Sequence, residues 1–87
     1  MAYRLTILPA AWRELSALSK SDQRRISQKI DQLAEDPRPS GAKMLQGRLR
    51  FFRIRSGDYR IIYTVEEDRQ RVLVVKVGHR RDVYRGL

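Results

Sequence analysis

The first half of the chain spaces its hydrophobic residues as a helix does. Pro9 suits a first helical turn, because the amide hydrogen that proline lacks is not needed there. A break at residues 19–22, where Ser21 or Asp22 can cap a helix, separates two apolar stripes. The first contains Ala11, Leu15 and Leu18, and the second contains Ile26, Ile30, Leu33 and Ala34. Pro37 ends the second helix, so the pattern predicts two antiparallel helices joined by a tight turn.

In the second half the period changes to two, which is typical of strands. Strands are expected at residues 49–55, 59–65 and 72–77, with turns at 56–58 and 66–70. Residues 2–8 form a plausible first strand, and residues 40–47, with two glycines, are expected to be a loop. The pattern therefore predicts a single α+β domain over residues 1–87. A three-stranded antiparallel meander and the N-terminal strand make a four-stranded sheet, with the helical hairpin on one face.

Composition narrows the class of protein. A chain of 87 residues can build one small core, and it contains no cysteine and one histidine, so neither a disulfide framework nor a zinc site is expected. The absence of a signal-like or membrane-spanning apolar run leads us to expect a soluble cytoplasmic protein with no membrane partner. The net charge is +9, and fifteen of the nineteen basic residues are arginine, which suits phosphate recognition.

Strand alternation predicts where the arginines point. If Tyr59, Ile61 and Tyr63 lie under the helices, Arg60 stands on the open face of the sheet. The same reasoning, with Phe52 and Ile54 in the core, sends Arg53 and Arg55 to that face. In the last strand Leu73, Val75 and Val77 are expected inward, and Val72, Val74 and Lys76 outward. Continued alternation places Arg80 outward and His79 inward, so Arg53, Arg55, Arg60 and Arg80 converge on one surface.

The tail that follows the last strand adds further candidate chemistry. Gly-His-Arg-Arg-Asp-Val-Tyr (78–84) contains Arg80, Arg81 and Tyr84, which together read as an RNA-facing site. The alternative is an ordinary solvated sheet face, on which arginine is common. His79 is an acid–base candidate, although its inward direction favours a structural role. Trp12 is assigned to packing.

Two segments carry a resemblance to a known family. Arg-Ile-Arg-Ser-Gly-Asp-Tyr-Arg-Ile-Ile-Tyr (53–63) and Val-Gly-His-Arg-Arg-Asp-Val-Tyr (77–84), in the order strand, helical hairpin and meander, resemble the RelE toxins of type II toxin–antitoxin pairs, in the RelE/ParE superfamily. The resemblance covers nearly the whole chain. It implies a metal-independent endoribonuclease, without a cofactor, that enters the 30S A site of the ribosome and cuts mRNA by attack of the RNA 2′-hydroxyl, which inhibits translation.

The resemblance also assigns roles to residues. Arg60, Arg80 and Tyr84 become catalytic, while Arg53, Arg55 and Arg81 hold RNA and stabilise transition-state charge. The best-known members often have lysine where this chain has Arg53 and Arg55, and arginine is a poor general base. Tyr84 is therefore the favoured base, and Arg80 stabilises the phosphorane. A second departure is that only three residues follow Tyr84 in this sequence.

Other functions stay open at this point. A ParE-like toxin would poison gyrase on the same scaffold, and a non-catalytic RNA-binding module would need the arginines but not Tyr84. The resemblance implies a heteromeric complex with an acidic, RelB-like antitoxin. A basic toxin surface fits an acidic segment that folds on binding.

Overall fold

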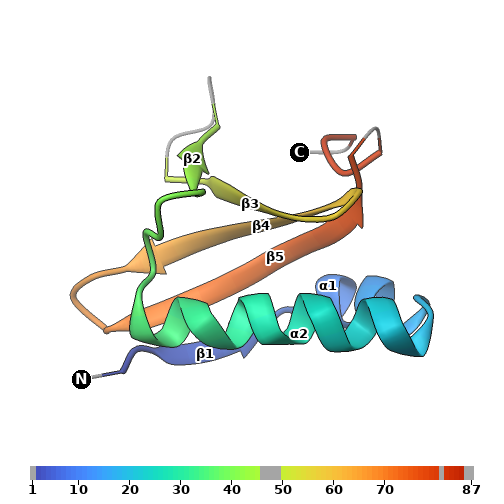
Figure 1. Cartoon of the computed structure of the whole chain (residues 1–87). Helices are drawn as coiled ribbons and strands as arrows, with labels where there is room; N and C mark the ends of the chain where they lie inside the picture. The colour runs from blue at the N-terminus through green and yellow to red at the C-terminus, as the bar shows by residue number, and fades with distance from the viewer. Residues whose placement is uncertain (1, 46–49, 81, 86–87) are drawn as a thin grey trace.

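In the residues that the structure describes, two helices lie against one face of a five-stranded mixed sheet (Figure 1). The computed structural model describes residues 2–45, 50–80 and 82–85. The elements in chain order are β1 (Arg4–Ile7), α1 (Pro9–Ser16), α2 (Lys20–Glu35), β2 (Lys43–Met44), β3 (Phe52–Ser56), β4 (Tyr59–Glu66) and β5 (Arg71–His79). The predicted α+β class, with both helices on one face, is confirmed.

The helical hairpin follows the predicted stripes, with two differences. Ala11, Leu15, Ile26, Ile30 and Leu33 are buried in the core, whereas Ala34 and Leu18, which lies beyond the end of α1, are half-buried. The cap of α2 is Ser19, not Ser21 or Asp22, because the Ser19 hydroxyl accepts the backbone N–H of Asp22 at 3.2 Å. The assignment of Trp12 to packing is wrong, since its side chain is 55% exposed. Trp12 directly follows the buried Ala11 on α1 and points away from the apolar stripe.

The sheet has the strand order β1-β5-β4-β3-β2. The meander β3-β4-β5 is antiparallel as predicted, and β1 joins one edge, where it runs parallel to β5. The sheet has five strands instead of four, because the expected loop at 40–47 contains the short strand β2, which pairs with the start of β3. β2 has only two residues, Lys43 and Met44, which are too few to show the alternation of polar and apolar side chains by which a strand is recognised from sequence. β3 begins at Phe52 rather than at residue 49, which lies outside the described residues.

A β-bulge changes which face the start of β5 presents. Ile62 pairs with Lys76 and Tyr63 with Val74, so Val75 is an extra residue in β5. The bulge reverses the alternation on its N-terminal side. Val72 and Val74 are therefore buried in the core, while Leu73 and Val75 are only half-buried, which is the opposite of the prediction for these four residues. Val77, beyond the bulge, is buried as predicted.

Tyr63 anchors the loop after α2 to the centre of the sheet. Its side chain is fully buried, and its hydroxyl donates to the carbonyl oxygen of Pro37 at 2.6 Å. The Phe52 ring stacks against it with centroids 5.7 Å apart. Burial raises the pKa of Tyr63 to about 12, because the ionised phenolate would lose its hydration there. The core thus fills the helix side of the sheet, whereas Ile62 and Arg60, on the other side of β4, are buried without contributing to it.

Candidate functional site

Basic side chains from three neighbouring strands share the open side of the sheet. Arg55 pairs directly with Arg60, and Arg53 pairs with Ile62. In the next pair of strands, Arg60 lies opposite Gly78, and Ile62 lies opposite Lys76. Directly opposite residues of antiparallel strands project to the same side. Arg53, Arg55, Arg60 and Lys76 therefore form one surface, which we call the cationic face.

Arg60 is the most enclosed member of the cationic face. Its side chain is 9% exposed, which makes it a buried charge. Its Nη1 donates to the carbonyl oxygens of Gly57 and Tyr59 at 3.1 and 3.0 Å. These bonds hold the guanidinium against the β3–β4 turn. Arg60 is thus oriented in advance, and little side-chain entropy remains to be lost when it meets an anion.

The positive charge of the cationic face is not balanced by carboxylates. Within the described part of the chain, the ion pairs lie elsewhere: Arg25–Asp22, Arg38–Glu67, Arg71–Glu66 and Arg85–Asp82. Placing Arg55 directly opposite Arg60 sets two like charges side by side, which is unfavourable in a sheet. An arrangement of this kind favours a bound anion that accepts several guanidinium hydrogen bonds.

The C-terminal turn folds back onto the same open face (Figure 1). Val83 is fully buried, and a Cβ placed on Gly78 would lie 3.4 Å from its Cα. The Val83 N–H donates to the carbonyl oxygen of His79 at 2.9 Å, which closes the turn. Lys76 Nζ donates to the carbonyl oxygen of Arg85 at 2.5 Å and ties the end of the turn to the sheet. The close approach at Gly78 leaves room for no side chain larger than a methyl group.

The structure brings most of the predicted site residues to one corner of the molecule. The Arg80 N–H donates to the carbonyl oxygen of Asp58 at 2.8 Å, so Arg80 sits beside the turn that also binds Arg60. Arg80 is exposed, and Tyr84, next to the anchored Val83, is 42% exposed.

Two other predicted residues differ from this group. His79 lies on the helix side, edge-on to the Tyr59 ring at 6.1 Å between centroids, which agrees with the predicted inward direction. Arg81 lies outside the described residues.

Sequence reasoning left three parts of this site unassigned. It placed Lys76 on the open face but gave it no role, although its spacing from Gly78 and Arg80 puts all three in one alternating series. Gly78 and Val83 position the turn through a tertiary contact. The only sequence signal for that contact is a glycine inside a valine-rich strand, which often marks close backbone approach.

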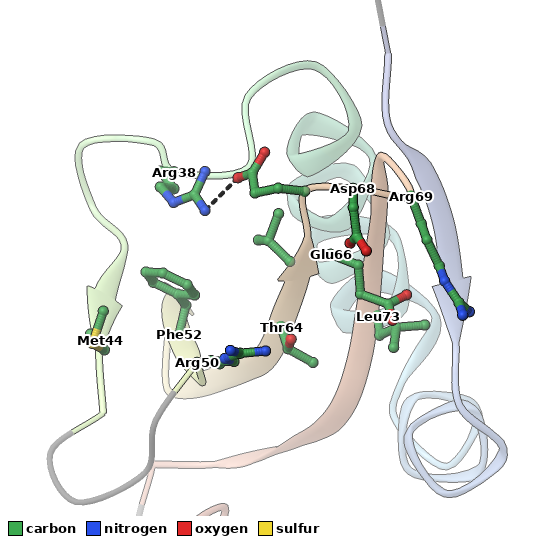
Figure 2. Close-up of a pocket in the computed structure, with 11 residues that line it drawn as sticks. Arg38, Met44, Arg50, Phe52, Thr64, Glu66, Asp68, Arg69 and Leu73 are labelled. Carbon is green, nitrogen blue, oxygen red and sulfur yellow. Dashed lines mark ion pairs between the residues drawn. The ribbon is translucent and has the colours of Figure 1, made fainter.

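A separate cleft of about 940 Å³ lies at the other end of the sheet, by the β4–β5 turn (Figure 2). Met44, Phe52 and Leu73 contribute apolar walls, and Arg38 bonds to Glu67 at 2.5 Å across one side. A hydrogen bond from the Tyr3 hydroxyl, together with the Arg38 guanidinium, lowers the pKa of Glu67. Because the carboxylates of Glu66, Glu67 and Asp68 share this cleft with its arginines, it is a weaker anion site than the cationic face.

Two other kinds of site are absent from the residues that the structure describes. They contain no group of three or more His, Cys, Asp or Glu side chains arranged to hold a metal ion. No helix formed by these residues has the length and apolar character needed to cross a membrane.

Comparison with known proteins relates most of the chain to toxins. Residues 5–84 match the family model described as the ParE toxin of type II toxin–antitoxin systems. A search of curated proteins found no significant match.

Solved structures similar to this chain include toxin–antitoxin complexes. A chain of the archaeal RelE–RelB complex from Pyrococcus horikoshii OT3 is 30% identical, with 95% of this chain and 100% of that chain covered and a TM-score of 0.81. A chain of the intact E. coli RelBE toxin–antitoxin complex is 29% identical, with 90% of this chain and 96% of that chain covered and a TM-score of 0.78. The RelBE2 complex from Mycobacterium tuberculosis, at 23% identity, 91% and 99% coverage and a TM-score of 0.81, shares the fold.

Proposed function

The chain belongs to the ParE toxin family of type II toxin–antitoxin systems, within the RelE/ParE superfamily, and on that premise we propose that it is a ribosome-dependent mRNA endoribonuclease. In this proposal the toxin enters the A site of the 30S subunit, cleaves the exposed mRNA and inhibits translation until an antitoxin binds it. A ribosomal target places the activity in the cytoplasm.

The observation that carries the proposal is the cationic face together with the turn beside it. Arg53, Arg55 and Arg60 point to one side and have no carboxylate partner among the described residues. Tyr84 is exposed and follows Val83, which packs against Gly78, the residue directly opposite Arg60 in the sheet. Arginines suit the phosphates of RNA, and an exposed phenol can exchange a proton or stack on a base.

The proposed chemistry is an internal transfer at one phosphate. The Tyr84 oxygen takes the proton of the RNA 2′-hydroxyl, and the 2′-oxygen forms a bond to the adjacent phosphorus. Arg60 and Arg80 stabilise the extra negative charge of the phosphorane. The bond from phosphorus to the 5′-oxygen then breaks, and that oxygen takes a proton from water while Arg80 donates a hydrogen bond to it. The hydroxide that remains takes the proton from the Tyr84 hydroxyl, which restores the phenolate that began the reaction. The products are a 2′,3′-cyclic phosphate and a 5′-hydroxyl end, and no metal takes part.

Two consequences follow from this reaction. DNA, which lacks the 2′-hydroxyl, cannot react, although its phosphates can bind the cationic face. Arg53, Arg55 and Arg81 are proposed to hold the RNA and to add to the charge stabilisation. His79, on the helix side beside Tyr59, is proposed to support the corner structurally rather than to transfer a proton.

The proposal is tested by primer extension on mRNA held in programmed ribosomes, with a ribosome-free sample in parallel. We expect a cut in the A-site codon only with ribosomes, and its loss in Arg80→Ala and Tyr84→Phe. Arg24→Ala is the matched control, because Arg24 is an exposed arginine on α2, outside the site. Binding to programmed ribosomes without any cut would indicate a non-catalytic RNA-binding module and reject the enzyme.

The family model itself favours a second candidate function. It is the model of the ParE toxin, and the alternative activity considered for a ParE-like toxin is poisoning of DNA gyrase. A supercoiling assay with purified gyrase separates the two candidates. Inhibition of gyrase by this protein, combined with intact mRNA on programmed ribosomes, would replace the nuclease proposal.

A further inference from the structure

The C-terminal end of β5 runs past the strand that flanks it on one side. β1 pairs with β5 as far as Ile7–Val74, and the N–H of Leu8 then donates to the carbonyl oxygen of Val74 at 2.9 Å. The chain leaves the sheet at Pro9, which has no N–H to donate and begins α1. Of the described strands, only β4 therefore accompanies β5 over its last residues, up to His79.

A side chain of α1 takes the place of the missing strand. The Val77 N–H donates to Glu14 Oε1 at 3.0 Å, and Figure 1 shows α1 beneath the end of β5. Val77 is buried, so without this carboxylate its N–H would lack an acceptor in a place that water reaches poorly, which is costly. The ion pairs of the described residues do not involve Glu14. Its carboxylate thus serves the backbone of β5.

The same end of β5 carries the C-terminal turn on which Tyr84 lies. Val83 packs against Gly78, the residue that follows Val77 in β5. Lys76 Nζ donates to the carbonyl oxygen of Arg85. Tyr84 therefore lies between two residues that are attached to β5, and the turn must move with that strand. Whatever holds the end of β5 in place also places Tyr84.

The arginines proposed to hold RNA are placed by a different part of the sheet. Arg53, Arg55 and Arg60 belong to β3 and β4, and the short hairpin between these strands sets its own register. The hydrogen bond of Glu14 ends on β5. Loss of this bond should therefore shift Tyr84 relative to the three arginines while the arginines keep their positions.

We propose that Glu14 is a positioning residue, which holds the end of β5 so that Arg80 and Tyr84 stay aligned with the arginines of the cationic face. Its effect on catalysis rests on the proposed function, whereas its effect on the position of the turn does not. Glu14 belongs to a helix on the opposite side of the sheet from the cationic face, so it acts through β5 and not by touching RNA. A shift of about 1 Å at a reacting group can lower a rate by about 100-fold.

Three substitutions of Glu14 separate the reach of its side chain from its charge. Glu14→Ala removes the acceptor, Glu14→Asp keeps the charge on a side chain one methylene shorter, and Glu14→Gln keeps the length and an acceptor oxygen without the charge. Hydrogen exchange of the Val77 amide in the free protein, measured by NMR, should become faster by about tenfold or more in Glu14→Ala and Glu14→Asp. In Glu14→Gln it should stay within about threefold of the unchanged protein.

The Arg80 amide reports whether the turn follows β5. Its N–H donates to the carbonyl oxygen of Asp58 at 2.8 Å, so displacement of the end of β5 breaks that bond. Exchange of the Arg80 amide should therefore become faster together with that of Val77 in Glu14→Ala and Glu14→Asp, and remain slow in Glu14→Gln.

Cleavage on programmed ribosomes tests the consequence for catalysis. In Glu14→Ala and Glu14→Asp, kcat should fall by about tenfold or more while KM stays within about twofold, because the arginines that hold RNA do not move. Glu14→Gln should restore kcat to within about threefold of the unchanged toxin, since its amide oxygen can accept the Val77 N–H.

Two control variants separate positioning from general effects. Glu35→Ala removes a carboxylate from the exposed end of α2 and so makes the same change in net charge as Glu14→Ala. Ser19→Ala destabilises the fold through the cap of α2, away from β5. At a temperature where every variant is folded, both controls should keep the kcat and KM of the unchanged toxin.

The proposal has clear contrary outcomes. Unchanged exchange of the Val77 amide in Glu14→Ala would overturn it, and so would a loss of kcat in Ser19→Ala equal to that in Glu14→Ala. A raised KM with unchanged kcat would also overturn it, because Glu14 would then act on RNA binding. If the unchanged toxin cuts no mRNA, the proposed function fails, but faster exchange at both Val77 and Arg80 in Glu14→Ala would still support Glu14 as the residue that places the turn.

Discussion

Removing one arginine from the cationic face should stabilise the fold while weakening RNA binding. Arg55 and Arg60 lie directly opposite each other on β3 and β4, and no described carboxylate pairs with either. At a guanidinium separation of roughly 8 Å and an effective dielectric constant of roughly 40–80, their repulsion is about 0.5–1 kcal/mol. Arg55→Gln removes this repulsion and keeps most of the side-chain stem.

Urea unfolding at low salt should therefore give Arg55→Gln a free energy of unfolding about 0.5–1 kcal/mol above that of the unchanged protein, or a Tm higher by about 2–8 °C. In about 1 M salt, where the screening length is ~3 Å, the gain should vanish. On RNA, the same variant should bind more weakly, and the slope of log K against log salt should fall by about 1.

Arg24→Gln, on the exposed side of α2, is the matched control and should change neither stability nor the salt slope appreciably. The reasoning fails if Arg55→Gln gains no more stability than Arg24→Gln at low salt. It also fails if the gain persists unchanged in high salt, since Arg55 is exposed and salt should weaken its repulsion with Arg60.

Three further predictions concern the parts of the fold that position the site. Tyr63→Phe removes the bond to Pro37 and should lower the free energy of unfolding by about 1–2 kcal/mol at neutral pH in urea titrations. Because the pKa of Tyr63 in the folded protein is raised to about 12, the contribution of Tyr63 to the free energy of unfolding is fully present below pH ~10 and is lost as the pH rises towards 12. The variant Tyr63→Phe should not show this loss of stability. An identical decline in stability at alkaline pH in both proteins would contradict the assignment. Val83→Asp should detach the C-terminal turn, because it places a carboxylate where Val83 is fully buried. Hydrogen exchange of the residue 83 amide, which donates to the carbonyl oxygen of His79, should become faster by about tenfold or more without global unfolding. Unchanged exchange would show that burial of Val83 does not hold the turn. Ser19→Ala should cost about 1 kcal/mol in thermal or urea unfolding through loss of the α2 cap, and Ser21→Ala should have little effect.

Much of the candidate site could be predicted from residue order because strand alternation is a local property. Arg53, Arg55 and Arg60 flank a two-residue turn, and a short hairpin of this kind sets its own register. Their common face therefore follows from the residues between 53 and 60 alone. The same holds for the helices, whose apolar stripes and terminating proline lie within a few turns of each other.

The tertiary structure decided the features that depend on pairing between distant segments. The bulge at Val75 exists because β5 must match β4 at both ends, and no local pattern records an extra residue. β2 is a strand only because β3 lies beside it. Arg60 is buried, and Val83 packs against Gly78, only because distant segments of the chain come into contact in the folded protein. The sequence by itself thus determined which residues face together, since side-chain direction alternates residue by residue. Only the tertiary structure decided which of them are enclosed, because burial depends on what the rest of the chain places on top.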